Sequence, residues 1–221
     1  MNIAFCRVPG IVIATLLIVA CNDENNVRPN TDHAMTAEKY ALIDMAIDEM
    51  VEAGDLPSGG RFIIADQTTM SDLAERFMES DETVDAASAL DFSFPYDFLP
   101  WTLDEADLAF GAYYRANLEP VDVRLEDLTV LERDTSLLMH EQFKEYLVDD
   151  PWAGWDAFHA DYPDAAGYVR LGNPVIFDEA GFALVHVDFT CGALCGIGFY
   201  ALFSLETGQW TFVDWYADWV S

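Results

Sequence analysis

Three histidines of this sequence have an acidic residue one or two positions away, which is the simplest arrangement that acid–base chemistry requires. The pairs are His186 with Asp188, His159 with Asp161, and His140 with Glu141. A histidine beside a carboxylate can accept and return a proton near neutral pH, so each pair is a candidate for acid–base work. With 40 Asp and Glu residues in the chain, some pairs arise by chance. No nucleophile elbow, metalloprotease helix or phosphate-binding loop accompanies them.

The cysteines offer a second kind of chemistry. Cys6 and Cys21 belong to the N-terminal segment, which leaves Cys191 and Cys195 for the folded part. Their C-x3-C spacing differs from that of redox-active C-x-x-C pairs, and a metal site formed with His186 would lack an evident fourth ligand. We expect a structural disulfide, as in exported proteins, and neither a metal nor another cofactor.

The charge of the chain limits its partners. Ten Lys and Arg residues face 40 Asp and Glu residues, for a net charge of −30, while 52% of the residues are apolar. Such a chain is globular, and its charge argues against binding nucleic acid or anionic membrane surfaces. The acidic residues have two explanations, a solvated surface or a specific calcium site. The first is favoured, because the sequence contains no calcium-binding loop of the D-x-[DN]-x-[DN]-G type.

The elements that must position these groups change character along the chain. Apolar residues recur three to four apart over 36–51, 134–147 and 152–162, which predicts helices; similar patterns occur over 69–78 and 102–117. Arg61–Asp66 is expected to be a short strand. After Gly167 the period becomes two, which predicts four strands. These strands are Tyr168–Ile176, Phe182–Thr190, Ile197–Leu205 and Gln209–Trp219.

The expected fold class is therefore α+β. A helical N-terminal two-thirds, residues 36–163, would pack on a C-terminal antiparallel β-meander, residues 168–219. His186 and Asp188 would share one face of a strand, because side chains two apart point the same way.

The N-terminus has the layout of an export signal. Arg7 precedes an apolar run over 11–20, which as a helix rises only about 15 Å, half of a hydrocarbon core of about 30 Å. Ile18-Val19-Ala20-Cys21 resembles the lipobox of bacterial lipoproteins, in which the cysteine is lipidated and becomes the first residue. The expected organisation is a signal peptide over 1–20, a polar tether over 21–35 and one domain over 36–221.

The C-terminal part carries a further resemblance. Its residues include Gly154-Trp155, Tyr162-Pro163, the CGxLCGxG run over 191–198, Gly208 with Trp210, and the closing Trp219-Val220-Ser221. On these residues the chain resembles a family of uncharacterised bacterial secreted proteins and lipoproteins, over roughly residues 37–221. Gly172-Asn173 departs from the Ser-Arg-type pair expected there. The resemblance implies the fold and the export, and it transfers no mechanism.

Three functional hypotheses remain open. The first is a lipid-anchored envelope protein, held in the membrane through Cys21 and facing the periplasm or the surface, whose domain is a non-enzymatic module that binds a small molecule or a protein. The alternative is an envelope hydrolase with a His/carboxylate site on the sheet, for which His186, Asp188, His159 and Asp161 are candidates. The third is a metal-handling protein.

Overall fold

The computed structural model describes residues 33–69, 112–113, 115–128, 135–147, 150–178 and 180–221. The predicted signal peptide, Cys21, most of the tether and the predicted helices over 69–78 and 102–117 lie largely or wholly outside these residues. The described helices are α1 (Ala37–Ala53), α5 (His140–Tyr146), α6 (Pro151–Asp161) and the 3₁₀ turn η2 (Leu125–Asp127). The strands are β1 (Arg61–Ala65), β2 (Ser136–Leu138), β3 (Ala165–Leu171), β4 (Val175–Phe177), β5 (Phe182–Gly192), β6 (Cys195–Glu206) and β7 (Gln209–Val220).

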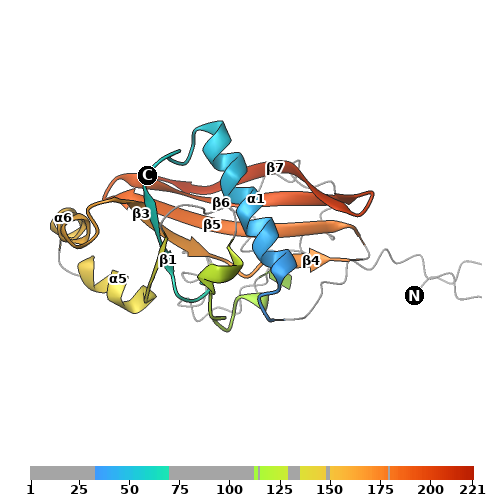
Figure 1. Ribbon diagram of the computed structural model, residues 1–221, viewed down its shortest axis with the longest axis horizontal. Coiled ribbons are helices and arrows are strands. Elements are labelled where there is room, and N and C mark those ends of the chain that lie inside the picture. Colours follow the sequence, from blue (N-terminus) through green and yellow to red (C-terminus); the bar gives the residue numbers. More distant parts are fainter. Residues whose placement is uncertain (1–32, 70–111, 114, 129–134, 148–149, 179) are drawn as a thin grey trace, which may run out of the picture.

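The strands form one mixed sheet. Within the described residues this sheet has seven strands in the order β2-β1-β3-β5-β6-β7, with β4 paired to β5 off this path. β1 runs parallel to both β2 and β3, whereas the pairs from β3 to β7 are antiparallel. Figure 1 shows α1 crossing the sheet and α5 and α6 gathered near one end of it.

The expected fold class is wrong. Residues 36–163 do not form a helical layer, since they supply β1 and β2, and β1 lies inside the sheet between β2 and β3. The sheet is therefore mixed and is not an antiparallel meander alone. Phe62 to Ala65 are all buried, as in a strand that is covered on both faces. Such a pattern shows how deeply a strand is buried, but it does not show which strands flank it.

Two predicted boundaries also fail. The helix expected over 134–147 begins as strand β2, and α5 starts only at His140. The strand expected over Tyr168–Ile176 is two strands, β3 and β4, separated at Gly172–Pro174. The three later strands are confirmed as β5, β6 and β7, each within a few residues of its predicted ends.

Helix α1 forms where the sequence predicts a helix. The hydroxyl of Thr36 accepts the amide of Lys39, and Gly54 ends the helix at a φ of 86°, which favours glycine. Tyr40, Ile43 and the other apolar side chains of its inner face are buried. Burial of this face holds α1 on the sheet.

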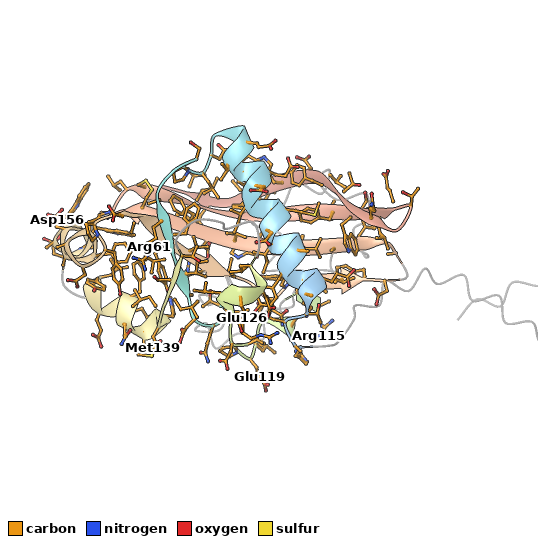
Figure 2. The ribbon with its side chains drawn as sticks, in the orientation of Figure 1. Arg61, Arg115, Glu119, Glu126, Met139 and Asp156 are labelled. Carbon is orange, nitrogen blue, oxygen red and sulfur yellow. A yellow bond between two sulfur atoms is a disulfide. The ribbon has the colours of Figure 1, made fainter. Side chains whose placement is uncertain are left out.

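The sheet is covered on both faces. Phe62 and Ile64 of β1 belong to the core under α1, whereas Ile63 and Ala65 belong to a second core with α5 and α6. Because side chains alternate along a strand, these two cores lie on opposite faces. Figure 2 shows Asp156 of α6 and Met139, the residue before α5, at the same end of the molecule.

Candidate functional site

A row of four residues crosses the sheet on the face opposite α1. The strand registers place Arg170 of β3 beside Asp188 of β5, Asp188 beside Gly198 of β6, and Gly198 beside Trp219 of β7. Val187, next to Asp188, belongs to the core under α1, so Asp188 points to the other face. The row joins residues that are distant in sequence into one cluster.

The carboxylate of Asp188 is the centre of this row. Its Oδ2 lies 2.8 Å from a terminal nitrogen of Arg170, and its Oδ1 accepts a 2.7 Å hydrogen bond from Nε1 of Trp219. The Asp188 side chain is 1% exposed and that of Arg170 is 10% exposed. A guanidinium and an indole N–H thus compensate much of the cost of burying this charge.

His186 lies on the same face of β5, as the sequence predicts. Its Nε2 is 3.6 Å from Oδ1 of Asp188, and its side chain is 1% exposed. The ring centroid of His186 lies 4.4 Å from that of Tyr200 and 6.1 Å from that of Tyr113, and both tyrosines are buried. The predicted His186–Asp188 pair is therefore brought together, but within an aromatic core.

Two glycines make room for this cluster. A Cβ on Gly198 would collide with the indole of Trp219 and with Oδ1 of Asp188. A Cβ on Gly172 would collide with the hydroxyl of Tyr113. Neither glycine lies at positive φ, so backbone conformation does not require glycine there. Glycine is required because a side chain would have no room.

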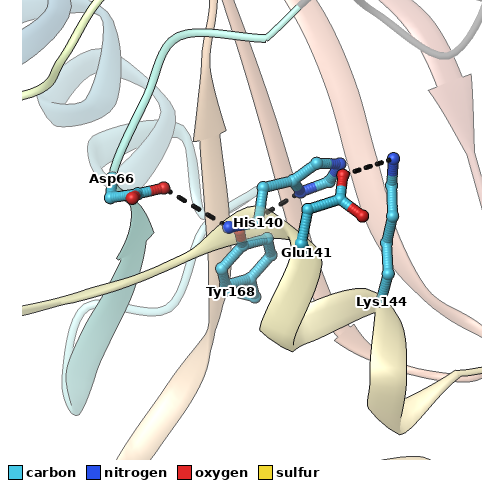
Figure 3. Close-up of polar contacts among 5 residues, drawn as sticks. All are labelled: Asp66, His140, Glu141, Lys144 and Tyr168. Carbon is cyan, nitrogen blue, oxygen red and sulfur yellow. Dashed lines mark hydrogen bonds and ion pairs between the residues drawn. The ribbon is translucent and has the colours of Figure 1, made fainter.

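A second polar group lies where β1 and β2 end (Figure 3). Asp66 follows β1, and its Oδ1 accepts the backbone amide of His140, 3.3 Å away. Nδ1 of His140 lies 3.3 Å from the hydroxyl of Tyr168 on β3. Burial raises the pKa of Tyr168 above its ordinary value, so its phenol stays protonated beside the imidazole of His140.

This second group lies beside a change in strand order. β1 is followed in sequence by β2 on one side of it, and β3 lies on the other side, so the carboxyl end of β1 is a point where the sheet order reverses. In open sheets with parallel strands, ligands bind at such points. Asp66 and His140 are both half-buried residues, but Nε2 of the His140 ring is itself buried.

The other two predicted pairs are not formed. His159 on α6 directs Nε2 to the carbonyl oxygen of Cys191 at 3.4 Å, whereas Asp161 accepts a 2.7 Å hydrogen bond from Tyr146. Residues two apart on a helix do not face each other, which explains the separation.

Glu141, for its part, lies 3.4 Å from Nζ of Lys144, in a contact that is largely exposed to solvent. It is an ordinary pair one helical turn apart.

Cys191 and Cys195 are joined in a disulfide, as predicted. Their sulfurs are therefore not available as thiolate ligands. Within the described residues, no group of three His, Cys, Asp or Glu side chains could hold a metal ion. The structure thus gives no support to a metal site formed by this pair and His186.

A buried amide cluster explains the break between β3 and β4. Nζ of Lys39, a residue only 3% exposed, lies 2.8 Å from Oδ1 of the fully buried Asn173. Asn117 accepts the Asn173 amide at 2.6 Å and donates to the Asn173 carbonyl at 3.1 Å. Asn173 also donates to the carbonyl of His33, so the chain just before α1 is attached to the domain.

Sequence reasoning missed Arg170, Trp219, Asp66 and Tyr168. One signal was available: Arg170 stands between Val169 and Leu171 in an apolar strand, where a buried arginine needs an acidic partner. The others depend on register and on parallel pairing, which the sequence pattern does not encode.

No helix among the described residues is long and apolar enough to cross a membrane. Comparisons with models of known families, with curated proteins and with solved structures find no match to this chain. The resemblance to a family of secreted proteins therefore stays an expectation drawn from its motifs.

Proposed function

We propose that this chain is a lipid-anchored protein of a bacterial envelope whose folded domain is a non-enzymatic binding module. One observation carries the non-enzymatic part. His186 and Asp188, the pair best placed in sequence for acid–base work, are each 1% exposed. Asp188 is committed to Arg170 and Trp219, so the pair functions as part of the core.

The proposed location rests on the N-terminal sequence and agrees with the disulfide. Ile18-Val19-Ala20-Cys21 follows a short apolar run, and the lipid on Cys21 would hold the protein in the membrane. Disulfides such as Cys191–Cys195 persist in oxidising compartments outside the cytosol.

Lipid labelling tests the anchor. Cells expressing the full chain are labelled with a palmitate analogue and separated into membrane and soluble fractions. We expect label and membrane association in the natural chain and in Cys6→Ala, which changes the other N-terminal cysteine. Cys21→Ala should lose the label and should give no membrane-anchored mature form. A mature, unlabelled chain in the soluble fraction of the natural protein would refute the anchor.

A second candidate function, an envelope hydrolase, is favoured by the half-buried His140. The hydroxyl of Tyr168 contacts Nδ1 of the His140 ring. The carboxylate of Asp66 accepts the backbone amide of His140 and so fixes that backbone at the carboxyl edge of β1. With its proton on Nδ1, this ring would have Nε2, a buried atom, as the nitrogen able to act as a general base.

Turnover separates the two functions. The purified chain is assayed on ester, amide, glycoside and phosphoester substrates, with His140→Asn, His186→Asn and His159→Asn as variants. The binding module predicts no turnover that depends on any of these histidines. Turnover lost in His140→Asn but kept in His159→Asn would establish the hydrolase and overturn the module. Native mass spectrometry of protein from its own envelope would then show what the module retains.

A further inference from the structure

The last strand of the sheet offers an edge for a partner. β7 has twelve residues and spans about 40 Å, and it stands at the end of the strand order. In the described part of the chain β6 is its only strand partner. Figure 1 shows β7, in red, along the rim of the sheet. None of its described side chains is fully buried.

The charge of this edge is one-sided. Residues 171–221 contain no Lys or Arg at all. They contain six acidic residues, of which Asp214 and Asp218 stand on β7 and Glu206 ends β6, whereas Asp188 is buried and paired with Arg170. Natural proteins usually protect a long edge strand with charged side chains, lysine above all. This edge has only acidic residues for that purpose.

Acidic protection excludes some partners and admits others. A second copy would bring Asp214 and a chain with a net charge of −30 against the same charges, and like charges across an edge repel. A basic strand would instead be attracted by the acidic residues of this edge. Charge complementarity therefore selects a basic segment over a second copy of this chain.

The backbone of β7 is regular enough to pair over its middle part. Register shifts opposite Gly198/Phe199 and Leu202/Phe203 leave one stretch of continuous register between them, Asp214–Ala217. Within it, Oδ1 of Asp214 accepts the amide of Trp215 at 2.8 Å. An added strand would take over that amide and leave the Asp214 carboxylate for a basic side chain.

Aromatic side chains add a second attraction for cations. Trp210 and Trp215 of β7 pack in part against the core under α1 and are half-buried, so each side chain keeps some exposed surface. A guanidinium or ammonium group over such a ring gains cation–π energy.

We propose that the β7 edge binds an extended, basic segment of another protein by strand addition, with Arg or Lys at alternate positions. Such pairing gives affinity through the main chain and specificity through alternate side chains. The inference rests on the proposed role as a binding module and names the surface and the partner class.

The test uses the full chain and a synthetic peptide in which Arg and Val alternate over about ten residues. We expect binding of one peptide per chain and new amide protection in β7 by hydrogen exchange. Thr211→Lys/Asp214→Lys, which changes two exposed residues of the edge, should weaken binding by about tenfold or more. Asp156→Lys, an exposed change on α6, should weaken it less than about twofold.

Several results would overturn the proposal. The first is that the peptide does not bind. The second is that Asp156→Lys weakens binding as much as Thr211→Lys/Asp214→Lys does. The third is that a peptide with methylated backbone amides binds as tightly as the unmodified peptide. A dimer of the natural chain that the lysine variant abolishes would put a second copy on the edge instead. If the double variant does not fold, Asp214→Asn keeps the test: it should weaken binding about two- to fivefold, and no change would count against the proposal.

The proposed binding role does not depend on the β7 edge being the binding surface. A partner retained from the envelope equally by the natural chain and by Thr211→Lys/Asp214→Lys would overturn the β7 inference and leave the binding role intact. Turnover lost in His140→Asn would instead overturn the binding role itself.

Discussion

The indole nitrogen of Trp219 lies 2.7 Å from Oδ1 of Asp188, although the two residues are 31 positions apart and sit on strands that are not neighbours. The indole reaches Asp188 across Gly198 of the intervening strand, which has no side chain to obstruct it. The final strand is thereby tied to a buried charge at the centre of the sheet. This relationship attaches the end of β7 to the core through the Trp219 side chain, which is itself half-buried.

Asp188→Asn should destabilise the fold strongly. The substitution keeps the shape of the side chain but leaves Arg170, whose side chain is 10% exposed, without its carboxylate partner. Loss of one member of a buried ion pair costs about 3–5 kcal/mol. Urea unfolding measures this free energy, with Asp156→Asn on exposed α6 as a control that should change it by less than about 0.5 kcal/mol. Equal stability of both variants would show that the pair contributes nothing.

Gly198→Ala should destabilise the domain through a steric clash. The added methyl group would meet Trp219 and Asp188, and such overpacking costs about 1–3 kcal/mol. Gly59→Ala is the matched control, since a Cβ there meets nothing within 4 Å. Combined with Trp219→Leu, the alanine should cost less than it does alone, because the clashing ring is gone. Additive effects in this double variant, measured by urea unfolding, would contradict the explanation.

The parts of the fold that the sequence predicts are those governed by local rules. Thr36 and Gly54 mark the ends of α1 because caps satisfy the free groups of a helix. β5, β6 and β7 follow from alternation and from turns whose glycines, Gly181 and Gly208, have positive φ. These signals lie within a few residues of the structure that they specify.

The parts that the sequence does not predict depend on distant partners. β1 pairs with β2, whose residues lie about seventy positions further along, and the pattern of Phe62 to Ala65 fits a buried strand in any sheet. The pairing of His186 with Asp188 follows from their spacing, but their enclosure depends on registers set by three other strands. The separation of His159 from Asp161 could have been predicted from the sequence, because residues two apart on a helix do not face each other.

Tyr146 offers a direct test of a side-chain contact. Its hydrogen bond to Asp161, together with burial, raises its pKa to about 12. Asp161→Asn removes the negative charge that opposes ionisation, so the pKa of Tyr146 should fall toward its ordinary value of about 10. Phenolate absorbance reports the titration, and comparison with Tyr146→Phe identifies the step. Asp156→Asn is the control, and an unchanged titration in Asp161→Asn would refute the contact.

Tyr168 should make the fold sensitive to alkali. Burial raises its pKa in the folded chain, so above about pH 10 the unfolded chain loses this proton while the folded chain keeps it. The contribution of this phenol to the free energy of unfolding is therefore fully present below about pH 10 and is lost as the pH rises further. In Tyr168→Phe, the free energy of unfolding should fall less between about pH 9 and 11 than in the natural chain. Parallel curves for the two proteins would show that burial of this phenol does not couple folding to pH.

The disulfide at the tip of the β5–β6 hairpin should act as a local constraint of modest strength. Cys191 and Cys195 are four positions apart, so the bond closes a very short loop. The chain-entropy argument gives about 2 kcal/mol for such a loop, which corresponds to a fall in Tm of about 4–8 °C for a domain of this size. Cys191→Ser/Cys195→Ser should therefore fold and melt lower by this amount.

Leu194→Ser is the matched control for the cysteine variant, because it makes a residue of the same hairpin polar at a position that is 71% exposed. It should change the free energy of unfolding by less than about 0.5 kcal/mol. Peptide mapping without reduction should recover residues 191 and 195 in one cross-linked peptide of the natural chain. Two free thiols in protein from the envelope, or a double variant as stable as Leu194→Ser, would contradict the stabilising role of the bond.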